Sequence, residues 1–142
     1  MKQNDKWFSM YSIDSLENKY QSSTAINNSG FYFTANGKAY YSDYNATTRI
    51  LHQYEQINSV HKGPKNTIIF ELGRNVQEAV GLIYNVIDKS NYPIYIYKLN
   101  NRFQSYRFTF IKYRDKTNSI LVLTNVGLYE VSVDDIMNFN PN

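Results

Sequence analysis

Residues Phe31–Asp43 read Phe-Tyr-Phe-Thr-Ala-Asn-Gly-Lys-Ala-Tyr-Tyr-Ser-Asp, two aromatic-rich runs separated by Asn36-Gly37. A two-residue turn of type I′ needs a positive φ at both central positions, and Asn followed by Gly adopts it with little strain. The stretch therefore predicts a β-hairpin in which Phe31–Ala35 pairs with Lys38–Ser42.

The segments on either side of this hairpin give weaker signals. Lys6–Ile13 is expected to form a short strand, whereas Asp14–Gly30 is polar and rich in Ser and Asn, which predicts a loop. Downstream, a helix is predicted over Ala46–Asn58. Its apolar stripe at helical spacing consists of Ile50, Leu51, Tyr54 and Ile57.

The next elements are expected to be an inner strand and a second helix. Gly63-Pro64 interrupts the chain, and Thr67–Leu72 then places apolar side chains on both faces of a strand, as a buried strand does. A helix is predicted over Val76–Asp88, with Asn75 as its N-cap and Glu78 in position to complete a capping box.

After Ser90 the pattern is that of strands joined by short turns. The predicted strands are Ile94–Leu99, Gln104–Tyr113, Ile120–Thr124 and Leu128–Val133, and Asp134-Asp135 is expected to begin a final helical turn. The chain is thus predicted to be one α+β domain over residues 1–142, with two helices on one side of the sheet. A strongly bent sheet that closes into a partial barrel is the alternative.

A short pattern occurs twice, 90 residues apart. Asn28, Ser29, Thr34 and Gly37 correspond to Asn118, Ser119, Thr124 and Gly127. Either a duplication or the turn chemistry of two unrelated hairpins would produce this correspondence.

Composition limits the classes of function. The chain has 142 residues, 14 of them Tyr, and no Cys, which excludes disulfides, thiolate metal sites and thiol nucleophiles. The first residues contain no apolar run of signal-peptide length, and no stretch is long enough to span a bilayer. We therefore expect a cytoplasmic protein without membrane contact. The abundance of Asn, Tyr, Lys and Ile, which have AT-rich codons, indicates a low-GC bacterium or one of its mobile elements.

Few side chains are candidates for chemistry. His52 and His61 lack the spacing of a paired metal site, and Glu71 is the best single carboxylate for an acid or base. A packing or surface role is favoured for both histidines, and pairing with Arg74 is the alternative for Glu71. No cofactor, metal or catalytic residue is predicted, and an enzyme is not expected.

Basic side chains are concentrated in the segment Tyr92–Lys116. It holds six basic residues and one acidic residue, a net charge of +5, whereas the whole chain carries +3. We interpret the segment as one β-hairpin in which Arg107, Thr109 and Ile111 face water. The predicted contact residues are Lys98, Arg102, Arg107, Lys112, Arg114 and Lys116, with Lys62 and Lys65 from the separate basic loop Lys62–Asn66.

Three functions remain open from the sequence. The first is a non-catalytic interaction protein of a phage or other mobile element, such as an inhibitor of a bacterial defence nuclease, which binds a protein or nucleoprotein partner. The second is direct nucleic-acid binding by the basic residues. The third is a small-molecule site or an enzyme that uses His52, His61 or Glu71.

Overall fold

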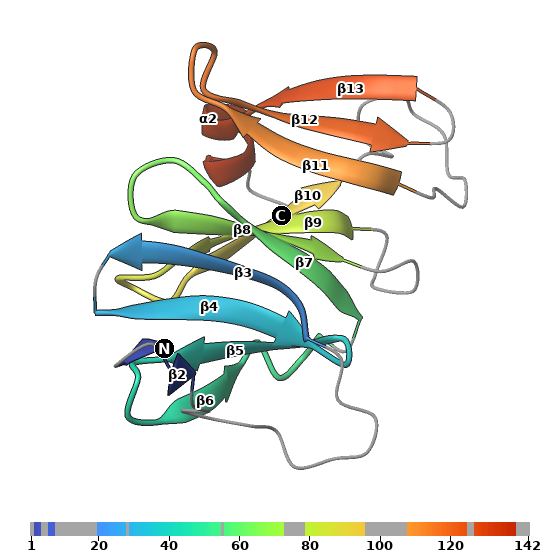
Figure 1. Cartoon of the computed structure of the whole chain (residues 1–142). Helices are drawn as coiled ribbons and strands as arrows, with labels where there is room; N and C mark the ends of the chain where they lie inside the picture. The colour runs from blue at the N-terminus through green and yellow to red at the C-terminus, as the bar shows by residue number, and fades with distance from the viewer. Residues whose placement is uncertain are drawn as a thin grey trace.

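The fold is built almost entirely from antiparallel strands (Figure 1). The computed structural model describes residues 2–3, 6–7, 20–27, 29–54, 56–72, 79–95, 108–124 and 127–138. Within these residues the secondary structure consists of strands and a single five-residue helix. The predicted α+β class is therefore wrong.

Three sheets follow one another along the chain, each with its strands in sequential order. The first sheet contains β3 (Tyr20–Asn27), β4 (Gly30–Ala35), β5 (Lys38–Ser42) and β6 (Thr47–Ile50). The second contains β7 (Ile57–Lys62), β8 (Thr67–Leu72), β9 (Ala79–Asn85) and β10 (Asn91–Tyr95). The third contains β11 (Phe108–Arg114), β12 (Ser119–Thr124) and β13 (Gly127–Ser132), and is followed by α2 (Val133–Met137). A separate two-stranded ladder joins β1 (Lys2–Gln3) to β2 (Lys6–Trp7).

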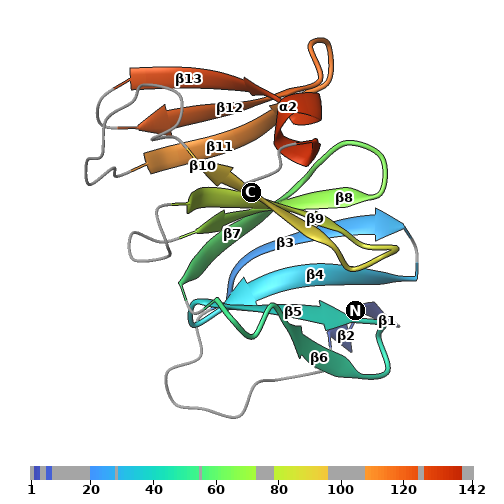
Figure 2. The same cartoon turned by 180° about the vertical axis from the view of Figure 1, so that it is seen from behind.

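The second sheet lies between the other two and is buried on both faces (Figure 2). One face carries Phe70 and Leu82, which pack with Tyr32 of the first sheet. The opposite face carries Ile69 and Ile83, which pack with the third sheet and α2. The two cores therefore arise from alternate residues of the same strands.

The tight turn predicted in the first sheet is confirmed. β4 and β5 pair from Phe31↔Ser42 to Ala35↔Lys38, and Asn36 and Gly37 have φ values of 53° and 77°. The Gly37 carbonyl also accepts a hydrogen bond of 2.8 Å from the Ile57 amide. The hairpin turn thus holds the start of β7 against the first sheet.

The helix predicted over Ala46–Asn58 is wrong. The segment forms β6, a turn in which Leu51 has a φ of 55°, and the beginning of β7. Thr47 and Thr48 favour a strand, and Leu51 and Ile57 reach the core from the turn and from β7 rather than along one helical face.

The helix predicted over Val76–Asp88 is also wrong, because residues 79–85 form β9. Ala79, Leu82 and Tyr84 belong to one core, and Val80 and Ile83 to the other. A strand covered on both faces is apolar almost throughout, so its pattern also satisfies a helical period. Val80 and Ile83 are buried in β9, with exposed fractions of 4% and 0%. Asn75 and Glu78 lie outside the described residues.

Two N-terminal predictions need correction or restriction. The segment Asp14–Gly30 contains β3, which pairs with β4, so the loop prediction is wrong for that part. Within Lys6–Ile13 the structure describes only Lys6–Trp7, which are extended in β2. The inner strand expected at Thr67–Leu72 is confirmed as β8.

The strands expected at Ile120–Thr124 and Leu128–Val133 and the final helical turn are confirmed as β12, β13 and α2. The strands expected at Ile94–Leu99 and Gln104–Tyr113 are confirmed only over residues 94–95 and 108–113, because the rest of each lies outside the described residues. The hairpin expected over Tyr92–Lys116 is wrong. β10 pairs with β9 in the second sheet, whereas β11 pairs with β12 in the third. The facing prediction fails as well: Ile111 is 1% exposed, and Lys112 on the next position is exposed. The pairing of β11 with β12 is irregular between Phe108 and Phe110. A register shift of one residue moves every following side chain to the opposite face of a strand.

Candidate functional site

A pocket of about 520 Å³ lies between the second and third sheets. β7 and β8 form one wall, and β11 forms the other. The lining residues are Ser59, His61, Lys62, Glu71, Ile111, Lys112 and Tyr113. The volume falls in the range of small-molecule sites, roughly 300–1,000 Å³.

Strand geometry places three polar side chains on the wall formed by the second sheet. Ser59 and His61 are two positions apart on β7 and so share a face, while Val60 between them is buried in the opposite core. Ser59 pairs in register with Glu71 of β8. A bulge between Ile57 and Ser59 sets this register, and bulges commonly re-aim side chains next to functional sites.

Ser59 connects the two titratable groups of this wall. Its Oγ lies 2.8 Å from His61 Nε2, and its hydroxyl also hydrogen-bonds the Glu71 carboxyl. When Glu71 is ionised, the hydroxyl donates to the carboxylate and accepts from the Nε2–H of His61. The order is His–Ser–Glu, in which the hydroxyl bridges the other two groups, and not the Ser–His–Asp order that activates a nucleophile.

Burial moves both titratable groups toward their neutral forms. Desolvation lowers the pKa of His61 below its ordinary value. Desolvation also raises the pKa of Glu71, although the hydrogen bond from Ser59 acts in the opposite direction.

Two lysines supply positive charge to the same pocket. Lys62 is the last residue of β7 and Lys112 lies in β11, so residues 50 positions apart in sequence line the same pocket. Both are exposed, and in the described part of the chain neither forms an ion pair. Tyr113 of β11 also lines the pocket. Its hydroxyl donates a hydrogen bond of 3.0 Å to Asn118 Oδ1, which holds the ring in place.

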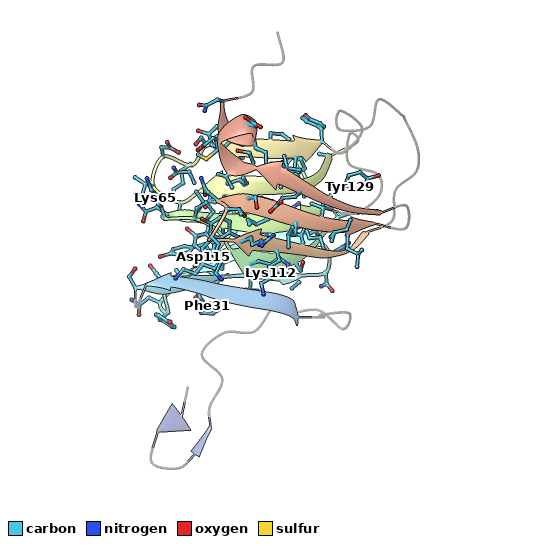
Figure 3. The ribbon with its side chains drawn as sticks, turned by 90° about the horizontal axis from the view of Figure 1, so that it is seen from above. Phe31, Lys65, Lys112, Asp115 and Tyr129 are labelled. Carbon is cyan, nitrogen blue, oxygen red and sulfur yellow. The ribbon has the colours of Figure 1, made fainter. Side chains whose placement is uncertain are left out.

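Three further described cations, Lys65, Arg114 and Lys116, lie at the end of the molecule where β7 and β11 finish. β7 ends at Lys62 and β11 ends at Arg114, and the turns that follow them carry Lys65 and Lys116. Figures 1 and 2 both place these two turns at the same end, and Figure 3 shows Lys65 and Asp115 toward one side. We call this surface the basic end, defined by Lys62, Lys65, Lys112, Arg114 and Lys116.

Acidic groups only partly offset the basic end. Arg114 Nη1 lies 3.4 Å from Glu130 Oε2, and both side chains are about half exposed, at 48% and 44%. The same Glu130 oxygen accepts hydrogen bonds from Ser119 at 2.6 Å and Thr117 at 3.1 Å. These hydroxyls are the main reason that the pKa of Glu130 is lowered. An exposed pair of this kind contributes little to stability.

The sequence-predicted residues thus fall into three groups. Lys62 and Lys112 line the pocket, whereas Lys65, Arg114 and Lys116 belong to the basic end but are not among the lining residues. Lys98, Arg102 and Arg107 lie outside the described residues. Of the chemical candidates, His61 and Glu71 meet in the pocket, whereas His52 is exposed in the turn after β6 and does not line it.

Sequence reasoning missed Ser59 and Tyr113. The alternation Ser59-Val60-His61 is the signal that could have identified Ser59, because it places a hydroxyl and an imidazole on one face of a strand. Recognising it required interpreting Ala46–Asn58 as strands rather than as a helix.

Asp134 and Asp135 belong to the first turn of α2, where the Ser132 Oγ accepts a hydrogen bond of 3.4 Å from the Asp135 amide.

In the described part of the chain, no group of three or more His, Asp or Glu side chains is arranged to hold a metal ion. The helical content described there includes nothing with the length and apolar character of a membrane span. No known family model matches this chain, and no curated protein resembles it in sequence.

Proposed function

We propose that this chain is a non-catalytic interaction protein that binds an anionic surface of a protein or nucleoprotein partner through its basic end. The observation that carries the proposal is the meeting of Lys62 and Lys112, from two different sheets, at one pocket. Cations clustered on one surface raise the local concentration of an anionic partner and speed its association. A bacterial defence nuclease loaded with nucleic acid is one such anionic partner, because it presents the phosphates of the nucleic-acid backbone.

Several further features support a binding role. The His–Ser–Glu order of the pocket does not activate a nucleophile. The chain is rich in tyrosine, a residue enriched at interfaces because it gives large contact area with few rotatable bonds. A cytoplasmic location belongs to the same proposal, since a chain without cysteine fits a reducing compartment.

Charge reversal at the turns tests the proposal. The partner is first captured from a lysate of the host bacterium, with and without nuclease treatment, and identified. Lys65→Glu and Lys116→Glu should each weaken its binding by about tenfold, and binding should fall as salt rises. Lys38→Glu is the matched control, because Lys38 follows the Asn36-Gly37 turn of the first sheet and lies outside the basic end.

The outcomes separate the open functions. Loss of binding in the two turn variants but not in Lys38→Glu supports the proposal. Equal binding by all three variants contradicts it. Retention of naked DNA or RNA at physiological salt, lost in the same two variants, would instead establish direct nucleic-acid binding.

A further inference from the structure

The pocket between the second and third sheets combines two cations with one hydrogen-bond acceptor. Lys62 and Lys112 are the cations, and Glu71 is the carboxylate among the lining residues. His61 and Ser59 form a hydrogen-bonded chain that ends on Glu71. A ligand that satisfies the site must therefore carry negative charge at one position and a hydrogen-bond donor at another.

We infer that this pocket binds a small phosphate ester that carries hydroxyl groups, with the size of a sugar phosphate or nucleoside monophosphate. A phosphate monoester carries about −1.5 to −2 charges at pH 7, which two lysines can balance. A hydroxyl of the ligand would donate to the Glu71 carboxylate, which the Ser59 hydroxyl does not saturate, since a carboxylate accepts about four hydrogen bonds. This site goes beyond the binding of a macromolecular partner, because it holds a separate small molecule.

Each lining residue has a definite role in this arrangement. Lys62 and Lys112 approach the phosphate from the two sheets, and an ammonium group binds phosphate as a compact charge. Ser59 holds the His61 ring by its Nε2 atom. An imidazole close to a phosphate becomes easier to protonate, because the anion stabilises the charged form. Binding should therefore reverse the effect of burial on His61.

Two histidines in the chain make this effect measurable. Proton NMR of the whole protein should show two imidazole Hε1 signals, which His52→Asn assigns. Addition of ribose 5-phosphate should raise the pKa of His61, whose charged and titratable neighbours in the pocket are Lys62, Glu71, Lys112 and Tyr113. The exposed His52 provides the reference signal in the same sample. Ribose is the uncharged control, and inorganic phosphate tests the anion alone.

Isothermal titration calorimetry with the same compounds then tests the residues. Lys62→Ala and Lys112→Ala should each weaken ribose 5-phosphate about tenfold, and Glu71→Gln should reduce the preference for ribose 5-phosphate over inorganic phosphate. Lys65→Ala and Lys116→Ala, at the basic end but outside the pocket lining, should bind as the unmodified protein does.

The inference fails if neither ribose 5-phosphate nor adenosine 5′-monophosphate produces heat and the His61 signal does not move. It also fails if Lys65→Ala weakens binding as much as Lys62→Ala, since the phosphate would then be held by general surface charge. Failure of the proposed partner interaction looks different: the partner tolerates Lys65→Glu and Lys116→Glu, while the small-molecule titrations are unaffected.

Discussion

The Ser59 hydroxyl joins two side chains that burial drives in opposite directions along the pH scale. For Glu71 the folded state binds the proton more tightly than the unfolded state. The contribution of Glu71 to the stability of the fold is therefore most favourable at low pH. This stabilisation is lost as the pH rises from the ordinary pKa of 4.5 through the raised pKa of the folded state. For His61 the sign is the reverse. Its contribution to the stability of the fold is present above pH 6.5, its ordinary pKa, and is lost as the pH falls through the lowered pKa of the folded state.

Replacing Glu71 with Gln should stabilise the protein at pH 7. The amide keeps the shape and can still hydrogen-bond Ser59, but it removes the cost of holding a partly buried charge. We expect the free energy of unfolding to rise by at most about 1 kcal/mol, because the side chain is partly exposed. This gain should shrink below pH 4.5. Urea unfolding at pH 7 and pH 4 measures it. A destabilised variant at pH 7 would mean that the two lysines more than compensate the buried carboxylate.

Gly81 in β9 lies against Ile111 of the third sheet. A Cβ added there would lie 2.7 Å from Ile111 Cδ1 and 3.3 Å from the Phe70 carbonyl oxygen. Gly81→Ala should therefore destabilise the fold by about 1–3 kcal/mol, as overpacking does. Ile111→Val removes the clashing methyl, so the double variant should lose less than the sum of the single changes in denaturant unfolding. Simple additivity would show that Ile111 is not the neighbour.

At the scale of elements, the turns and the strands differ in how strongly sequence determines them. The β4–β5 turn is determined locally, because only residues that tolerate a positive φ fit both central positions. β9 is determined by its surroundings, because it is buried by two different sheets that lie far from it in sequence.

The local control of the β4–β5 turn leads to a direct test. Gly37→Val should destabilise the protein by about 1–2 kcal/mol, since a β-branched residue resists the φ of 77° at this position. The melting temperature measures the effect, and Asn36→Gly, which also accepts a positive φ, is the tolerated comparison. An unchanged melting temperature for Gly37→Val would show that the turn does not have this conformation.

The same contrast explains what the sequence could predict. The Asn36-Gly37 turn, the buried strand Thr67–Leu72 and the helical turn at Asp134-Asp135 depend on neighbouring residues, and all three were predictable. The helix expected at Val76–Asp88 fails because apolar residues on both faces of β9 satisfy a helical period as well. The helix expected at Ala46–Asn58 fails because its apolar stripe combines residues of β6, of the following turn and of β7. Only the stacking of sheets reveals the true period.

The candidate site shows the same limit. Lys62, Lys112, His61 and Glu71 could each be selected by residue type, but nothing in the sequence places them in one pocket. Their meeting depends on the packing of β11 against β7 and β8, together with the bulge that aligns Ser59 with Glu71. The basic hairpin predicted from charge alone is replaced by a basic end formed by two sheets.

At the scale of the whole molecule, three sheets of consecutive strands are stacked, and the second sheet carries a core on each face. In this stack β7 and β11 end at the same side of the molecule, as Figures 1 and 2 show. The polar ends of these strands and the turns after them therefore form one surface. Both the proposed partner interaction and the proposed phosphate site depend on this stacking.

The most direct test of the account measures the separation of Lys62 and Lys112. Because the chain has no cysteine, Lys62→Cys/Lys112→Cys accepts two nitroxide labels without further change. Lys38→Cys/Lys112→Cys is the control pair, since Lys38 belongs to the first sheet and packed sheets lie about 10 Å apart. Pulsed electron–electron double resonance should give a narrow distance distribution for the Lys62/Lys112 pair. Its mean distance should be clearly shorter than that of the control pair. A broad distribution, or one as long as the control, would show that the two sheets do not bring these lysines to one pocket.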